Sequence, residues 1–178
     1  MTTHCNQWFA YWAARELGLC LKLNHGCNKP LIKQFFSVIS RLGNGVFWYS
    51  LILVLPLIYG VDALMISVQM TISGLIGLAI YKSIKAVTLR ERPYYLHSNI
   101  QLGTAPLDRY SFPSGHTLHA FNFTLIAIYH YPELSFLLIP FMLLVAVSRV
   151  VLGLHYPTDV ICGAILGSLV AATSLVLV

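Results

Sequence analysis

Residues 160–178 read V-I-C-G-A-I-L-G-S-L-V-A-A-T-S-L-V-L-V and contain no charged side chain. This stretch approaches the ~20 residues that a helix needs to cross a bilayer. Four more apolar stretches precede it, at about 46–59, 63–81, 117–129 and 134–147. The chain is 57% hydrophobic and 10% charged, with a mean hydropathy of +0.74. We therefore expect an all-α fold, an integral-membrane helical bundle with five transmembrane helices.

The N-terminal part of the chain differs from these stretches. The segment from Trp8 to Leu23 is aromatic and aliphatic, but Arg15 and Glu16 lie in its middle. Charges at membrane depth are costly, so we expect an amphipathic helix in the membrane interface; if the segment crosses instead, the bundle has six spans. Pro30 is typical of a first helical turn, and the pattern up to Leu42 predicts a second amphipathic helix.

The composition also limits domains and partners. No linker, repeat or charge run divides the chain, so we expect a single domain, 1–178, with an interfacial segment at 1–45 and a membrane core at 46–178. The net charge of +5 lacks the basic stripe typical of nucleic-acid binding and fits anionic lipid or a phosphorylated substrate better. No CxxC pair indicates zinc, and no obligate protein partner is predicted. The cysteines are Cys5, Cys20, Cys27 and Cys162.

Three polar islands lie between the apolar stretches. The first contains Lys85 and Arg92-Pro93. In a helix continued from the preceding span, residues seven apart share a face, so both cations are expected to point to one place. An ammonium and a bidentate guanidinium suit a phosphate. A positively charged membrane flank is the alternative if this island is taken alone.

The second island is Pro113-Ser114-Gly115-His116, which leads directly into an apolar helix. Free backbone N–H groups at a helix start, the Ser114 hydroxyl and the helix dipole form an anion site. His116 then lies beside the bound anion. A simple N-cap turn explains the same residues equally well.

The third island reads Ser148-Arg149, five residues, His155, three residues, Asp159. Pro157 favours a helix start, and the carboxylate of Asp159 can accept a proton from one imidazole nitrogen, which leaves the other as a nucleophile or base. A structural His–Asp cap is the alternative for the pair alone. Two helices separate the second and third islands, so both lie on the same side of the membrane.

Together, Lys85-x6-Arg92-Pro93, Pro113 to His116 and Ser148-Arg149-x5-His155-x3-Asp159 resemble the three signature motifs of the type 2 phosphatidic acid phosphatase (PAP2) family of lipid phosphate phosphatases. The resemblance implies a metal-independent membrane lipid phosphatase without a cofactor. Its substrate is a phosphate or diphosphate of a lipid: phosphatidate, phosphatidylglycerophosphate or undecaprenyl diphosphate. The larger bacterial members of the family have six spans, and Trp8 to Leu23 corresponds to their first.

The resemblance also implies a role for each motif residue. His155 attacks phosphorus to form a phosphohistidine, Asp159 orients it, and His116 protonates the departing oxygen and activates water. The phosphate is bound by side chains and backbone of Lys85, Arg92, Ser114, Gly115 and Arg149.

Sidedness is indicated in two opposite ways. All Lys and Arg residues precede the first span or lie in the motif islands, and the positive-inside rule places that side in the cytoplasm. The family resemblance implies an extracytoplasmic site, in a bacterial inner membrane, and we follow the resemblance.

Two other functions compete with the phosphatase. Related vanadium haloperoxidases bind vanadate with the same residues, but they are typically soluble. A lipid-binding or transport protein would need only the cations, and the His116, His155 and Asp159 set argues against it.

Several other residues have two interpretations. His119 follows His116 by one turn and either joins a metal site or forms a polar wall of the same cavity; we favour the wall. Tyr94, Tyr95 and Tyr110 fit an interfacial aromatic belt better than a headgroup entry. Gly163 and Gly167 form a GxxxG pair, for which close packing within the bundle is favoured over dimerisation. The complete list of these residues is Tyr94, Tyr95, Tyr110, His119, Gly163 and Gly167.

Overall fold

The computed structural model describes residues 2–177, with the side chains of residues 11, 12 and 14–177. Regular structure in this part is helical throughout. Cys5 and the start of the Trp8 to Leu23 segment lie outside the described side chains. The elements are α1 (Thr2–Asn24), η1 (His25–Asn28), α2 (Pro30–Leu42), α3 (Val46–Tyr59), α4 (Ala63–Thr88), α5 (Pro93–Leu96), α6 (Gly115–His130), η2 (Pro132–Leu134), α7 (Ser135–Val151) and α8 (Pro157–Leu177).

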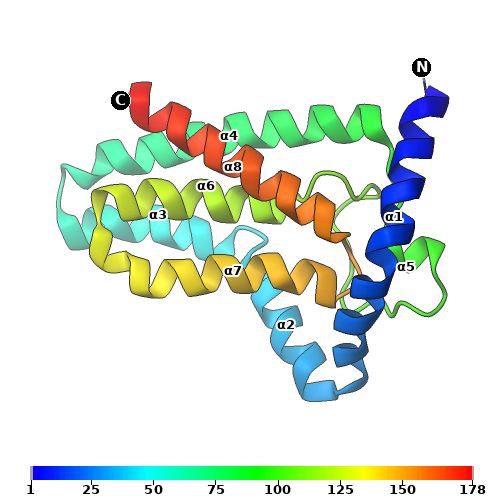
Figure 1. Cartoon of the computed structure of the whole chain (residues 1–178). Coiled ribbons are helices and arrows are strands. Elements are labelled where there is room, and N and C mark those ends of the chain that lie inside the picture. Colours follow the sequence, from blue (N-terminus) through cyan, green and yellow to red (C-terminus); the bar gives the residue numbers. More distant parts are fainter. Residues whose placement is uncertain (1, 178) are drawn as a thin grey trace.

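Five helices, α3, α4, α6, α7 and α8, run alongside one another and form the bundle (Figure 1). α6 is the central helix, since it packs against α4, α7 and α8. Its side chains Ala120, Phe123 and Ile126 belong to the main core, together with Trp48 of α3 and Leu138 of α7. Each of the five predicted apolar stretches is thus a helix, and the predicted all-α class is confirmed.

Three of these elements are long and apolar enough to cross a membrane: Ala63–Leu96, Pro132–Val151 and Pro157–Leu177. A fourth crossing is available if Pro30–Leu42 and Val46–Tyr59, which are bent by 51° relative to each other, form one broken span. α6 has only 16 residues. The described part of the chain therefore offers three to four candidate spans, and the predicted count of five remains a prediction.

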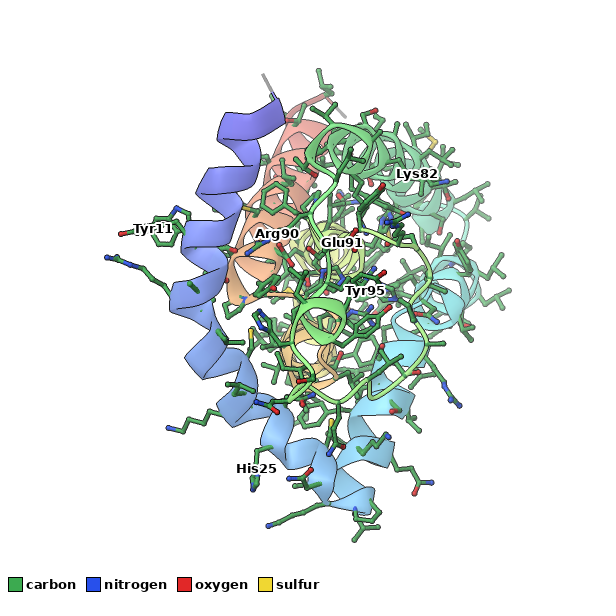
Figure 2. The ribbon with its side chains drawn as sticks, turned by 90° about the vertical axis from the view of Figure 1, so that its right-hand side faces the viewer. Tyr11, His25, Lys82, Arg90, Glu91 and Tyr95 are labelled. Carbon is green, nitrogen blue, oxygen red and sulfur yellow. The ribbon has the colours of Figure 1, made fainter. Side chains whose placement is uncertain are left out.

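α1 runs across the ends of the bundle helices rather than along them (Figure 1). A view turned by 90° agrees, because it shows the bundle helices nearly end-on with α1 lying beside them (Figure 2). α2 follows through a short 3-10 turn and has the bounds predicted from Pro30 and Leu42. Both helices lie at the end of the bundle where the three polar islands meet.

Candidate active site

The two cations of the first island converge, but they do not share a helix face. α4 ends at Thr88, and Leu89 takes a left-handed conformation with φ of 49°. Arg92 is extended, as expected for a residue before proline, because Pro93 clashes with a helical predecessor. The predicted common helix face of Lys85 and Arg92 is therefore wrong.

Asp108, in the loop between α5 and α6, is what joins these cations. Lys85 Nζ donates to both carboxylate oxygens of Asp108 at 2.8 Å. Arg92 donates to Asp108 Oδ1 at 2.6 Å and, through Nε, to the Asp108 carbonyl at 3.1 Å. Both cations are buried, whereas the Asp108 side chain is 39% exposed. An anion that binds these cations therefore has to compete with a resident carboxylate.

The second island begins α6 as predicted. The Ser114 hydroxyl accepts from the Thr117 N–H at 3.5 Å and lies 2.9 Å from the Thr117 hydroxyl, so the N-cap interpretation is confirmed. The Ser114 N–H donates to the Asp159 carbonyl at 3.0 Å, which ties the second island to the third. His116 reaches further, and its Nε2 pairs with Oδ1 of Asn44, in the break between α2 and α3.

The third island places His155 just before α8, which begins at Pro157 as predicted. His155 Nδ1 lies 3.6 Å from Asp159 Oδ2, which is longer than a hydrogen bond, and Nδ1 has no hydrogen-bond partner, so the predicted proton donation to the carboxylate is not formed here. The same oxygen accepts from the Tyr156 N–H at 2.8 Å. His155 Nε2 lies 3.2 Å from a guanidinium nitrogen of Arg92. The imidazole thus has its Nδ1 toward the aspartate and its Nε2 toward a cation.

Arg149 is the motif residue whose position differs most from the expectation. It is 2% exposed, donates to the Ser40 hydroxyl of α2, and does not line the cavity that the other cations line. Its Nε has no hydrogen-bond partner. A buried guanidinium with an unused donor is costly, so the group remains available for an anion.

A cavity of about 370 Å³ joins most of these groups. Its polar lining includes Lys85, Arg92, His116 and His155, with the backbone of Gly115 beside them. The remaining wall is largely apolar and comes from α3, α4 and α6. Its apolar members include Trp48, Tyr49, Ile52, Leu53, Leu75, Leu78 and Phe123. The cavity can therefore hold an anion at one end and an apolar chain along its length.

The state of the imidazole follows from its surroundings. Burial removes His155 from water, and the nearby charges of Arg92 and Arg149 add to this effect. Both causes keep the pKa of His155 well below its ordinary value. The ring is therefore neutral at neutral pH, and a lone pair is available on Nε2 or Nδ1.

Two of the remaining predictions are resolved by packing. His119 lines the same cavity, stacks on Phe123 at 5.5 Å and has no metal partners, since no group of three His, Cys, Asp or Glu in the described chain could hold an ion. This favours the polar-wall interpretation. Gly163 and Gly167 face α6, where an added Cβ on Gly163 would lie 2.5 Å from the Ser114 carbonyl oxygen. Close packing within the bundle is therefore confirmed.

Comparison with known families supports the same site. A model of the PAP2 superfamily matches residues 62–178, which contain all three motifs. The chain belongs to the PAP2 superfamily. The match confirms the resemblance inferred from the motifs.

Among curated proteins, the chain is 37% identical to undecaprenyl-diphosphatase BcrC of Bacillus subtilis over 101 residues, which are 57% of this chain and 49% of the relative. It is 33% identical to an undecaprenyl-diphosphatase of Sulfolobus acidocaldarius over 111 residues, 61% and 53% of the two chains. It is 43% identical to decaprenylphosphoryl-5-phosphoribose phosphatase of Mycolicibacterium smegmatis over 81 residues, 45% and 42% of the two chains. The chain thus spans about half the length of these relatives.

Two solved structures share the fold. Aquifex aeolicus LpxE superposes with a TM-score of 0.78 at 25% identity, covering 90% of this chain and 94% of LpxE. A transmembrane PAP2-type phosphatidylglycerolphosphate phosphatase of Bacillus subtilis gives a TM-score of 0.70 at 23% identity, covering 99% and 94%. With its long apolar helices, the chain is an integral-membrane protein.

Four residues that contact the motif side chains or their partners were missed in the sequence. Asp108 and Asn44 lie in loops, where no periodic pattern indicates which way a side chain points. Arg90 has its guanidinium 2.5 Å from Asp159 Oδ1 and is 5% exposed, yet it resembles one more basic flank residue. Glu16 pairs with Arg90 from α1. For Glu16, the one indication in the sequence was its position in an apolar helix, where an acidic residue needs a partner.

Proposed function

We propose that this protein is a membrane lipid phosphatase that acts through a phosphohistidine on His155. The observation that carries the proposal is one cavity that joins a neutral buried imidazole, two cations and a second histidine to an apolar wall. The cations suit a phosphate, and the apolar wall suits a lipid chain. Membership of the PAP2 superfamily supports the same chemistry.

In the first step, Nε2 of His155 attacks phosphorus and the bond from phosphorus to the lipid oxygen breaks. His116 donates a proton to the departing oxygen. Asp159 orients the imidazole and compensates the positive charge that the ring gains. The phosphoryl oxygens are bound by Lys85, Arg92, Ser114, Gly115 and Arg149.

In the second step, water attacks phosphorus while His116 accepts its proton. The bond between phosphorus and His155 then breaks, and orthophosphate leaves. With a lipid diphosphate the leaving group of the first step is the lipid monophosphate. Cationic side chains compensate the phosphoryl charge throughout, and we propose that neither a metal nor another cofactor takes part.

The proposed substrates are lipid phosphates and diphosphates: phosphatidate, phosphatidylglycerophosphate and undecaprenyl diphosphate. Two relatives named undecaprenyl-diphosphatase support the diphosphate in particular. A panel of these three lipids with release of phosphate as the readout ranks them. No obligate protein partner or nucleic acid is proposed, and the bilayer is the medium in which the substrate reaches the site.

For the topology, we propose five spans, α3, α4, α6, α7 and α8, with α1 and α2 in the interface. The course of α1 across the ends of the bundle supports an interfacial position (Figure 1). Residues 1–45 then form the interfacial segment and 46–178 the membrane core of a single domain. Tyr94, Tyr95 and Tyr110 belong to the proposed aromatic belt at this level.

We place the protein in a bacterial inner membrane with its site on the extracytoplasmic side. Five spans put the C-terminus on the opposite, cytoplasmic side. Reporter fusions at the C-terminus test this: a reporter that is active only in the cytoplasm is expected to be active. Activity of a periplasmic reporter would reverse the orientation.

Hydrolysis in detergent with EDTA tests the function itself. The purified protein is expected to release phosphate from a lipid phosphate in the presence of EDTA and to be inhibited by vanadate. His155→Ala is expected to be inactive. Loss of activity in EDTA, or full activity of His155→Ala, would contradict the proposal.

A further inference from the structure

Glu16 is a carboxylate of α1 that the chemistry proposed above does not use. Its side chain is 9% exposed, although α1 lies at the surface of the bundle. The residue also lies outside residues 62–178, the part that matches the PAP2 superfamily. A charge is costly to bury unless it is paired and hydrogen-bonded. The partners of Glu16 therefore indicate its role.

The first partner is Thr158, in the opening turn of α8. Oε2 of Glu16 accepts from the Thr158 N–H at 2.7 Å, and Oε1 accepts from the Thr158 hydroxyl at 2.8 Å. N–H groups in a first helical turn lack partners within the helix, and the helix dipole favours an anion there. Glu16 thus caps the N-terminus of α8, and Asp159 directly follows the capped residue Thr158.

The second partner is Arg90, whose guanidinium lies between two carboxylates. One nitrogen lies 3.3 Å from Oε1 of Glu16, and another donates to Oδ1 of Asp159 at 2.5 Å. The guanidinium also covers the Tyr156 ring at 4.1 Å. Figure 2 shows Arg90 on the bundle side of α1, near the start of α8. A continuous chain of contacts therefore runs from α1 to Asp159.

Two further contacts, one and two turns after Glu16, hold α1 in place. Cys20 is buried in a cluster with Val150 and Tyr156, the residue that follows His155. Further along, Asn24 donates to the carbonyl of Val151 at 2.9 Å. These contacts fix α1 against the segment between α7 and α8. Glu16 therefore has a defined position relative to the nucleophile.

We propose that Glu16 is a positioning residue that acts on Asp159 through Arg90, so that α1 completes the active site; this rests on the proposed phosphohistidine chemistry. Arg90 alone neutralises Asp159. With Glu16, this group of one cation and two carboxylates carries a net negative charge on the Nδ1 side of His155, opposite the Arg92 cation on its Nε2 side. When Nε2 bonds to phosphorus, the ring becomes positively charged, and this net negative charge stabilises it.

The test compares Glu16→Gln with Arg15→Gln, a matched variant on the same helix whose side chain is exposed. Rapid quenching after mixing with a short-chain phosphatidate in detergent gives the rate and amplitude of phosphoenzyme formation. Glu16→Gln retains an oxygen for Thr158 but loses the charge. We expect its rate constant to fall about tenfold, with KM and amplitude unchanged, as for one partly screened charge near the reacting ring. Arg15→Gln is expected to match the wild type, and Glu16→Asp to be intermediate.

Two results overturn this inference. Either Glu16→Gln forms the phosphoenzyme at the wild-type rate, or it loses amplitude at an unchanged rate, which marks a purely structural cap. A wild-type protein that forms no phosphoenzyme instead overturns the proposed function. The two failures are thus distinguishable in one experiment.

Discussion

Replacing Asp108 by Asn is expected to strengthen inhibition by vanadate. In the structure, Lys85 and Arg92 both bind the Asp108 carboxylate, with distances of 2.8 Å and 2.6 Å. These are the cations assigned to the phosphate, so vanadate has to displace the carboxylate or share the cations with it. The amide of Asn is neutral and competes less well.

The size of the effect follows from these contacts. A hydrogen bond to a charged group contributes ~1.5–3 kcal/mol. The Asp108 side chain is 39% exposed, so solvent screening places the value at the lower end. About 1.4 kcal/mol corresponds to a tenfold lower inhibition constant. Asp108→Asn also leaves two buried cations with a weaker partner, which lowers the melting temperature of the variant without ligand. Vanadate is therefore expected to raise the melting temperature of the variant by more than that of the wild type.

The assay is a vanadate titration of lipid phosphate hydrolysis in detergent, combined with thermal unfolding. Glu91→Gln is the matched control, because Glu91 forms an ion pair with the exposed Arg109 at 3.2 Å and neither residue lines the cavity. It is expected to leave the inhibition constant unchanged. Equal or weaker inhibition of Asp108→Asn would refute the reasoning and indicate that the carboxylate orients the cations for phosphate instead.

Three further predictions concern packing, proton transfer and pH. Gly167→Ala places a methyl group against the Leu118 carbonyl of α6 and is expected to cost ~1–3 kcal/mol of stability, measured by thermal unfolding. Gly18→Ala is the control, because the space around Gly18 is open, and equal melting temperatures of the two variants would contradict the packing. His116→Gln is expected to slow hydrolysis of a lipid phosphate ~10²–10⁴-fold but a nitrophenyl phosphate much less, because that leaving group needs no proton; equal losses contradict the acid role. Burial and the Arg92 charge hold the pKa of His155 well below its ordinary value. As the pH falls below about 6.5, His155 therefore binds a proton in the unfolded chain but stays neutral in the folded chain, and stability is lost. Melting temperatures at about pH 7.5 and about pH 5 are expected to differ less in His155→Gln, and an identical difference contradicts this source of the pH dependence.

The helices could be predicted because each apolar stretch is free of Asp, Glu, Lys and Arg, and the polar corners between them are unambiguous. Four motif residues that the structure brings to one cavity could be singled out because cations and histidines gather in three polar islands on one side: Lys85, Arg92, His116 and His155. Arg92 shows the limit of this approach. Its spacing from Lys85 fits a helix face, but the proline after it forces an extended backbone. The two cations still meet, through a loop carboxylate that no spacing rule places.

The N-terminal helix shows a second limit. Arg15 and Glu16 are neighbours, and both charges are expected near water for the same reason. In the structure Arg15 lies over the Tyr11 ring at 4.6 Å and is exposed, whereas Glu16 is nearly buried against Thr158 and Arg90. Which of two adjacent charges is buried depends on residues more than seventy positions away. Local pattern cannot contain that information.

The central claim is a covalent phosphohistidine on His155, and trapping it is the most direct test. The purified protein is mixed with a radiolabelled lipid phosphate in EDTA and quenched in alkali, and the labelled peptide is identified by mass spectrometry. The account predicts label on His155, stable to alkali and lost in acid, and none in His155→Ala. Label on another residue, or turnover of the substrate by His155→Ala, would contradict it.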